Sequence, residues 1–476
     1  MIRISAILLL LVVSVSLVAQ QNSTLFFMPY TPQANFVNPA ITNDCKLIIG
    51  IPVLSSVHVN AGNSGFSFND ALRKQSDTSY LFDGNSVMRR LGKVSYFDTE
   101  LHTNLLFVGY WYKKSYLTFT INEKADMLVT YPKDLFAIGW KGNSQFEGEI
   151  AKLGRTGAFL NYRREFAFGI ARETNKGVWW GARAKLLFGK LNTTVTRSKL
   201  NLYTEPLTFD LTFYSDWTFK TSLPLTVTTN PSGTMRSAEW RDPSAGEILL
   251  NRKNVGLATD LGFVNDLGNG VTVSGSILDL GFISWKTDGY SFSQKGEYTY
   301  SGPLGDSIDN EDYLENLTRI IRDEFGITAR PTSYVQMLSP RVYLGATYDL
   351  GNNLSAGLVG TAKINRLKTT TGVTVSLNKQ FSEKFSGSVS YSYLYRDFRN
   401  LGVGVKVGKS PLQFYFVTDN IIGFFNPYGA RNVNVRFGLH LNFGCEKNEE
   451  FSGCGCSGMD NAAKHREHLK KLLKKK

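Results

Sequence analysis

The sequence predicts an all-β transmembrane barrel, and three observations predict it. Apolar and polar residues alternate in run after run, as in "KFSGSVSYSYLYR" (384–396). Runs of about ten or more residues recur between Lys46 and Phe443, the length that a tilted strand needs to cross a bilayer. After the N-terminal stretch, no window holds the roughly 18 apolar residues of a membrane helix. We therefore expect a membrane-spanning antiparallel barrel of about 14 strands, within a range of roughly 12 to 16.

The first element is a predicted secretory signal peptide at residues 1–19. Arg3 precedes an apolar stretch from Ile4 to Val18, and Ala19 follows it. A retained membrane helix competes with this interpretation, but the stretch is shorter than the roughly 20 residues that a bilayer needs. We expect an N-terminal lumen or periplasmic segment at 20–45, the barrel at 46–444 and a Cys-containing basic periplasmic tail at 445–476.

The strands alternate with a period of two. In 385–396, Phe385, Val389, Tyr391, Tyr393 and Tyr395 share one face, and Ser386, Ser388, Ser390 and Ser392 share the other. A soluble sandwich alternates in the same way, so only the length and number of the runs favour a barrel. We expect the first strand at 46–60 and the last at 431–443.

The connections predict the orientation of the barrel. Tight turns are expected at "NDLGNG" (265–270), "YDLGNN" (348–353) and "KQFSEKF" (379–385). Long connections are expected at 61–98, 221–253 and 286–339. Bacterial outer-membrane barrels have short periplasmic turns and longer outer loops, so both termini are expected to be periplasmic.

Aromatic residues near the predicted strand ends are typical of interfacial girdles. They are Tyr110, Trp111, Tyr112, Trp179, Trp180 and Trp285. A packed core explains the same residues, and the sequence leaves that alternative open.

Two cysteines flank the predicted barrel. Cys45 precedes the first strand, and Cys445 follows the last strand by two residues. In hydrocarbon the last strand must pair with the first, because every backbone polar group needs an internal partner. A Cys45–Cys445 disulfide would join this seam in an oxidising compartment, and two free thiols are the alternative.

One segment breaks the strand period. In "DNEDYLENLTRIIRDEFG" (309–326), Leu314, Leu317, Ile320, Ile321 and Phe325 recur at helical spacing. A short helix in an extracellular loop could gate the outer mouth or plug the lumen, and a packed surface loop is the alternative.

The lumen face of the predicted strands carries polar candidates. These residues are His58, Arg436, His440 and Asn442. A nucleophilic arrangement on the barrel wall is conceivable, but no local signature supports one, and we find neither a phosphate-binding loop nor paired carboxylates. We expect no enzyme activity, no catalytic residues and no cofactor.

The predicted tail carries Cys454, Cys456, His465 and His468. Two thiolates and two imidazoles could form a zinc site, although the spacing matches no strong motif, and a local disulfide or free thiols are alternatives. Residues 464–476 hold six lysines and one arginine against Glu467, a charge of +6 out of the total +13. The barrel itself is thus only mildly basic, and no nucleic-acid partner is expected.

Two stretches resemble a known family. "FVNPAITNDCKLIIGIPVLSSVHVNAGNSGFSFND" and "TDNIIGFFNPYGARNVNVRFGLHLNFG" resemble a Bacteroidota outer-membrane β-barrel family of unknown function. More distantly, Asn38-Pro39-Ala40 followed by a barrel is similar to the long-chain fatty acid transporter superfamily, which includes the type IX secretion shuttle barrel. This resemblance implies an N-terminal segment that reaches into the lumen, and it carries over no catalytic residue.

The expected function is therefore that of a porin-like outer-membrane protein in contact with outer-membrane lipid. The first hypothesis is binding or passage of a hydrophobic or amphipathic ligand. The second is a structural or accessory component of type IX secretion or a surface assembly, which the basic tail tethers to a periplasmic or secretion-system partner.

Overall fold

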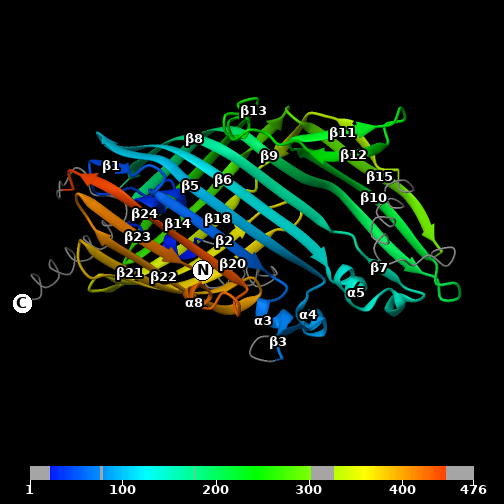
Figure 1. Cartoon of the computed structure of the whole chain (residues 1–476). Coiled ribbons are helices and arrows are strands. Elements are labelled where there is room, and N and C mark those ends of the chain that lie inside the picture. Colours follow the sequence, from blue (N-terminus) through cyan, green and yellow to red (C-terminus); the bar gives the residue numbers. More distant parts are fainter. Residues whose placement is uncertain (1–21, 76–78, 176, 302–325, 446–476) are drawn as a thin grey trace, which may run out of the picture.

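The protein forms a closed antiparallel β-barrel of fourteen strands in the part of the chain that the structure describes (Figure 1). The structure is a computed structural model, and it describes residues 22–75, 79–175, 177–301 and 326–445. The predicted barrel is confirmed. No helix within the described ranges is both long and apolar enough to span a membrane.

Several barrel strands consist of two or three pieces, and other elements separate the pieces β10 and β13 in the chain. In chain order the strands are β1 (Leu47–Gly50) with β2 (Ser56–Asn63), β5 (Val94–Tyr112), β6 (Ser115–Pro132), β8 (Gly157–Asn175), β9 (Val178–Thr204), β10 (Leu211–Ser222) with β13 (Asn254–Gly268), β14 (Val271–Trp285) with β15 (Gly289–Tyr300), β16 (Thr328–Pro331) and β17 (Tyr334–Met337) with β18 (Arg341–Gly351), β19 (Leu354–Lys363), β20 (Thr370–Gln380), β21 (Phe385–Leu394), β22 (Asp397–Gly408), β23 (Leu412–Thr418) and β24 (Asn432–Phe443).

Short elements lie before and between these strands. They are α2 (Ser23–Phe26), η1 (Pro32–Phe36), α3 (Phe68–Ala71), β3 (Leu72–Lys74), β4 (Tyr80–Phe82), α4 (Gly84–Arg90), α5 (Lys133–Lys141), η2 (Ser144–Phe146), β7 (Ile150–Lys152), β11 (Leu225–Thr229), β12 (Met235–Trp240), α6 (Ala245–Leu249) and α8 (Ile421–Phe425).

The last strand closes the barrel against the first. β24 pairs with β1 through Leu47↔Phe443 and with β2 through Val57↔Phe437. The expected single strand 46–60 is wrong, because residues 51–55 interrupt the ladder and Val53 has φ 67°. At the start of this seam, Cys45 and Cys445 are joined by a disulfide bond.

The connections differ at the two ends of the barrel. The three predicted tight turns are confirmed, and Asn269, Asn352 and Asn353 take the positive φ values that tight hairpins require. These turns share the left-hand end in Figure 1 with the start of β1 and the end of β24. The expected long connection at 286–339 is wrong in part, because β15 and β17 extend the wall there.

The alternation places polar residues inside the barrel and apolar residues outside. Ser386, Ser388, Ser390 and Ser392 are buried, whereas Val389 is 52% exposed. Tyr395 departs from the predicted outward face: it lies in the turn after β21, with φ 53°, and is buried. An apolar outer face with a polar interior is the reverse of a soluble core, and it is the pattern of a membrane barrel.

The aromatic girdle prediction is wrong for half of its residues. Tyr110, Tyr112 and Trp180 face outward, but Trp111, Trp179 and Trp285 are buried inside. The reason is the period of two, since neighbouring residues of a strand must point to opposite faces. Trp111 and Trp179 pack edge to face with ring centroids 6.1 Å apart.

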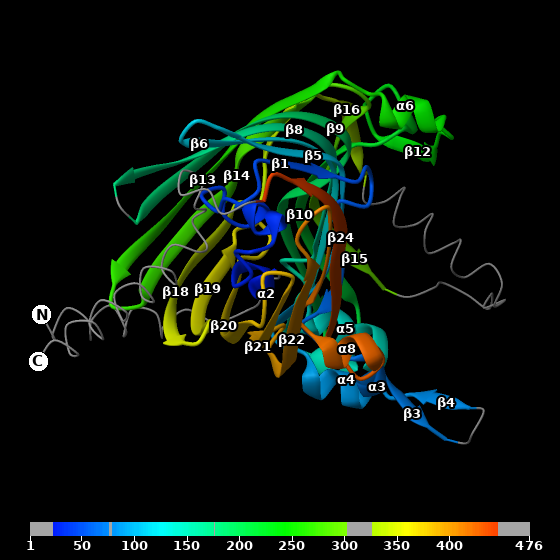
Figure 2. The ribbon, with the colours of Figure 1, turned by 90° about the vertical axis from the view of Figure 1, so that its left-hand side faces the viewer.

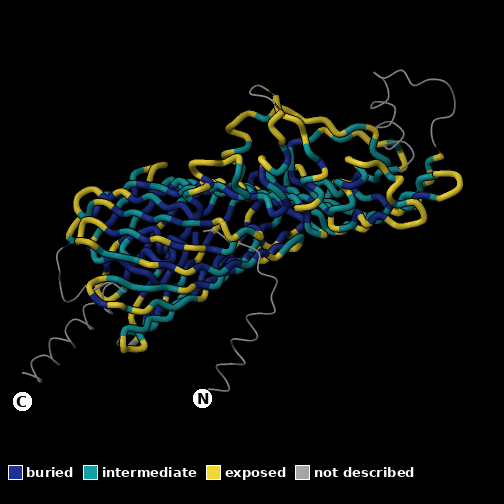
Figure 3. Tube along the Cα trace, turned by 90° about the horizontal axis from the view of Figure 1, so that it is seen from below, coloured by how far each residue is buried: buried dark blue, intermediate teal, exposed yellow. Residues whose placement is uncertain are grey.

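The wall continues beyond the barrel on one side. β10 pairs with β9 and β15 over its whole length, and β11 and β12 form a separate two-stranded sheet beside them. We call residues 192–253 and 286–300 the outer extension. Buried residues gather in the barrel and become sparse in this extension (Figure 3).

Candidate functional site in the barrel lumen

The N-terminal segment lies inside the barrel. Residues 22–43, here called the plug, include α2 and η1 and are almost entirely buried. Figure 2 shows α2 inside the barrel, and α2 contacts strands β20 to β23. The apolar residues Leu25, Phe26 and Phe27 form a cluster with wall residues that include Tyr343 and Tyr415. The plug and the wall thus share an apolar cluster inside a lumen that is otherwise largely polar.

The start of the plug is held by one carboxylate. Asp419, which follows β23, accepts hydrogen bonds from the backbone N–H groups of Asn22 at 2.7 Å and Thr24 at 2.8 Å. Arg436 donates from Nε to the Asn22 side-chain oxygen at 2.9 Å. Hydrogen bonds to ionised groups are among the stronger ones. The two hydrogen bonds to Asp419 are therefore the main polar anchor of α2.

The middle of the plug is held by the opposite wall. Arg183 donates from Nη2 to the backbone carbonyl of Asn35 at 2.8 Å, and Asn38 donates to the carbonyl of Phe263 at 3.0 Å. Gly181 lies so close that a Cβ there would overlap the backbone of Pro39 and Ala40. The absence of a side chain at Gly181 therefore makes room for the plug.

Buried charges cross the lumen beside the plug. The ionic network consists of Glu100, Lys124, Asp126, Arg163, Glu165, Arg183, Lys185, Asp260, Asp279, Arg341 and Lys363. Five acidic side chains face six basic ones, so the network is close to neutral. Such balance is required, because an unpaired charge in a buried site is strongly destabilising.

A β-bulge brings two of these acids together. The pairing of β13 with β14 shifts between Thr259 and Leu261, and Asp279 takes φ 58°. Lys185 then bridges the pair, with Nζ 2.6 Å from an Asp260 oxygen and 2.5 Å from an Asp279 oxygen. Neither acid was predicted from the sequence, although each is a lone aspartate in an apolar run, "LATDLGF" and "SILDLGF", and this was an available signal.

Two cavities border the plug. One of about 50 Å³ lies between Asn22, Phe36 and the ionic network. The other, of about 120 Å³, lies near the short-turn end and is lined in part by Phe26, Met28 and Val264. Both are walled by plug and barrel together, so a movement of the plug would change both.

The predicted lumen residues all lie inside the barrel. His58, Arg436, His440 and Asn442 are buried on β2 and β24. His440 approaches the plug, with Nδ1 3.5 Å from Nε2 of Gln33, whereas Asn442 donates to the Gln413 side chain at 2.6 Å.

Two other groups of predicted residues lie outside the described ranges. They are the loop-helix residues Leu314, Leu317, Ile320, Ile321 and Phe325 and the tail residues Cys454, Cys456, His465 and His468.

The fold and the lumen together define a plugged, closed β-barrel of the membrane-spanning kind. Comparison with known sequences shows the family: the chain belongs to a family of unknown function (DUF5723), whose profile matches residues 39–419. No protein of curated function matches the chain significantly.

Solved structures resemble the barrel only remotely. The toluene transporter TodX of Pseudomonas putida is 8% identical, with a TM-score of 0.38 and coverage of 87% of this chain and 95% of that one. A FadL homologue of Pseudomonas aeruginosa is 11% identical, with a TM-score of 0.39 and coverage of 89% and 96%. The outer membrane phospholipase of Salmonella typhi is 11% identical, with a TM-score of 0.20 and coverage of 83% and 92%. No function is carried from these proteins to this chain.

Proposed function

We propose that this protein is an outer-membrane barrel that binds a hydrophobic or amphipathic ligand in its lumen and passes it when the plug moves. The observation that carries this proposal is the way the plug is held. Its polar anchors, such as Asp419 with Thr24, are hydrogen bonds between the plug and the wall, and cavities remain beside it. Contacts of this kind can be exchanged for water or ligand without breaking the barrel.

The larger cavity is big enough to hold only one part of a ligand molecule while the plug stays docked. The cavity measures about 120 Å³, with Phe26, Phe27 and Met28 of the plug on one side and polar wall residues such as Asp349 and Lys379 on the other. Its volume is somewhat smaller than the roughly 150 Å³ of an apolar cavity that holds a benzene ring. The docked plug therefore leaves room for a short alkyl segment with a polar end, which is the chemistry of an amphipathic ligand. A longer ligand needs the plug to shift.

The proposal includes an orientation in the bacterial outer membrane. The short turns and both termini lie on the periplasmic side, because barrels of this kind carry their short turns there. The signal peptide at 1–19 and the periplasmic tail at 445–476 belong to the same proposal. Catalysis has no part in it.

Locking the plug to the wall tests this function. The Oγ atoms of Thr24 and Ser390 lie 2.7 Å apart, so cysteines at both positions can form a disulfide. The double variant, in a chain with Cys454→Ser and Cys456→Ser, is reconstituted in liposomes, and uptake of the apolar fluorophore N-phenyl-1-naphthylamine is measured. We expect uptake to stop in the oxidised protein and to return after mild reduction, while Thr24→Cys alone remains active.

Two outcomes of the uptake measurement would contradict the proposal. Equal uptake by the locked and unlocked protein would contradict a gating plug. Uptake by the wild type no faster than by protein-free liposomes would contradict passage of apolar ligands.

A second candidate function is that of an assembly component, and the outer extension favours it. Leu207, Phe209, Trp240 and Leu250 expose more than half of their surface there. Trp240 at the end of β12 and Leu250 directly after α6 lie close together in the chain. Exposed apolar side chains that form a patch are typical of protein-binding surfaces. Native pull-downs would compare the wild type with Trp240→Ser/Leu250→Ser and with a chain that ends at Lys447. A partner lost with either variant supports assembly, and a lipid-like ligand retained without any partner supports transport.

A further inference from the structure

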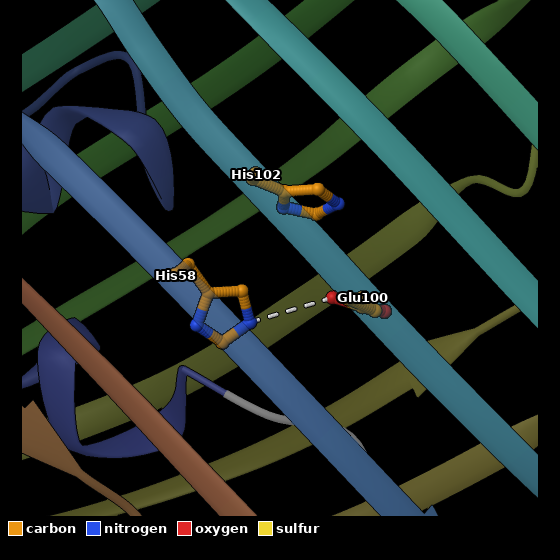
Figure 4. Close-up of side chains that lie close together, drawn as sticks. All are labelled: His58, Glu100 and His102. Atoms are coloured by element: carbon orange, nitrogen blue, oxygen red, sulfur yellow. Dashed lines mark ion pairs between the residues drawn. The ribbon is translucent and has the colours of Figure 1, made fainter. Parts of the chain in front are cut away.

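Three metal-ligating side chains converge on the lumen wall beside the plug. His58 on β2 lies directly opposite His102 on β5 in the strand register, and Glu100 precedes His102 by two residues on the same face. One ligand atom from each of the three side chains lies within 4.8 Å of the other two. Figure 4 shows the two imidazoles and the carboxylate facing one another across the two strands.

Polar atoms in this cluster are buried without partners. Neither ring nitrogen of His58 has a hydrogen-bond partner among the described residues, and the same holds for Oε2 of Glu100. Nε2 of His58 and Oε2 of Glu100 lie 3.6 Å apart, which is within ion-pair distance if His58 is protonated (dashed line in Figure 4) but too long for a hydrogen bond. Buried polar groups are normally hydrogen-bonded, so these three atoms indicate a missing hydrogen-bonding or metal partner.

The surrounding residues orient the cluster as the second shell of a metal site does. His102 Nε2 lies 2.9 Å from Oδ1 of Asp126, an arrangement that assigns the proton to Nε2 and leaves a lone pair on Nδ1. Arg341 and Lys363 both contact Oε1 of Glu100, whereas Oε2 accepts no hydrogen bond from the described residues. Oε2 therefore keeps its lone pairs on the side of His58.

We propose that His58, Glu100 and His102 bind one divalent transition-metal ion, with Zn²⁺ as the reference ion. Two imidazoles and one carboxylate are a donor set that suits such ions. Metal bonds of about 2.0–2.1 Å require the ligand atoms to approach one another by small side-chain rotations. His102 also helps to line the cavity of about 50 Å³, which has room for a water molecule as a fourth ligand.

The metal would join β2 to β5 next to the barrel seam. This site does not depend on the proposed passage of a ligand, since all three residues belong to the wall and none to the plug. The alternative is an ion pair of protonated His58 with Glu100, without metal, and the experiment separates the two.

The test uses the folded full-length chain in detergent. Cys454→Ser, Cys456→Ser, His465→Gln and His468→Gln remove the candidate ligands of the tail and define the tail variant. After loading with Zn²⁺ and gel filtration, metal is counted by mass spectrometry, and its ligands are identified by X-ray absorption. We expect one Zn²⁺ per chain, bound to nitrogen and oxygen at about 2.0–2.1 Å and not to sulfur.

Single substitutions in the tail variant then locate the site. His58→Gln and His102→Gln should each weaken Zn²⁺ binding at least tenfold. His440→Gln is the matched control, because His440 is a buried lumen histidine outside the cluster, and it should leave binding unchanged. Should the cluster variants fail to fold, the absorption spectrum of the tail variant still decides, because two bound imidazoles have a distinct signature. A folded tail variant without bound Zn²⁺, with Zn²⁺ that lacks imidazole ligands, or with undiminished binding after both substitutions would overturn the proposal.

Discussion

Asp419 accepts the backbone N–H of Thr24 at 2.8 Å, although the two residues lie 395 positions apart in the sequence. One carboxylate at the end of a wall strand thereby holds the first turn of the plug. This contact can be tested by substitution, and so can the Lys185 ion pairs, the outward-facing side chain of Leu358 and the Cys45–Cys445 disulfide.

Replacing Asp419 by alanine should release the start of the plug. The change removes both hydrogen bonds from Asn22 and Thr24, and hydrogen bonds to charged groups contribute about 1.5–3 kcal/mol each. Thiol labelling of a Thr24→Cys reporter should accelerate at least tenfold while the barrel stays folded. Asp397→Ala is the control, since Asp397 pairs with Arg399 and does not contact the plug. Unchanged labelling would mean that the apolar cluster alone holds the plug.

Replacing Lys185 by methionine should destabilise the barrel strongly. The variant leaves Asp260 and Asp279 without their shared cation, and breaking a buried ion pair costs about 3–5 kcal/mol. Urea unfolding in detergent measures the change. Arg197→Met is the matched control, because its partner Asp216 lies in the outer extension and exposed pairs contribute only about 0–1 kcal/mol. Similar losses in both variants would argue against a special role of the ionic network.

An arginine on the outer face of the barrel should show which part of that face contacts the lipid chains of the membrane. Leu358 on β19 is 52% exposed and faces outward from the barrel. Leu358→Arg should cost about 2–4 kcal/mol when the protein is folded into a bilayer, as lipid-facing arginines do at the membrane centre. Leu207→Arg, in the outer extension, should cost close to nothing. If Leu358→Arg and Leu207→Arg lowered the stability in liposomes equally, the lipid-facing zone would lie elsewhere on the barrel.

Removing the seam disulfide should lower stability without changing the fold. Cys45 and Cys445 are separated by 400 positions, and a bridge over a long loop typically stabilises a protein by about 2–4 kcal/mol. Cys45→Ser should lower the free energy of unfolding by this amount, whereas Cys454→Ser should not. A non-reducing peptide map of the wild type should contain Cys45 linked to Cys445. Its absence after oxidising preparation would exclude the bridge.

The sequence by itself determined the apolar and the polar face of the strands. The alternation of Ser388 with Val389 is a local property, because neighbouring residues of an extended chain must point to opposite sides. The tight turns were equally local, since asparagine and glycine tolerate the positive φ that these hairpins need. The cysteine pair could be named because closure requires that the two ends of the barrel meet.

Only the tertiary structure decided what meets inside the lumen. Lys185, Asp260 and Asp279 come from three strands, and a bulge that no period predicts brings them together. His58 was predicted to face the lumen, but its position opposite His102 follows from the strand register. Register and closure depend on contacts between segments far apart in the chain, and a single sequence records the residues of such contacts without recording their pairing.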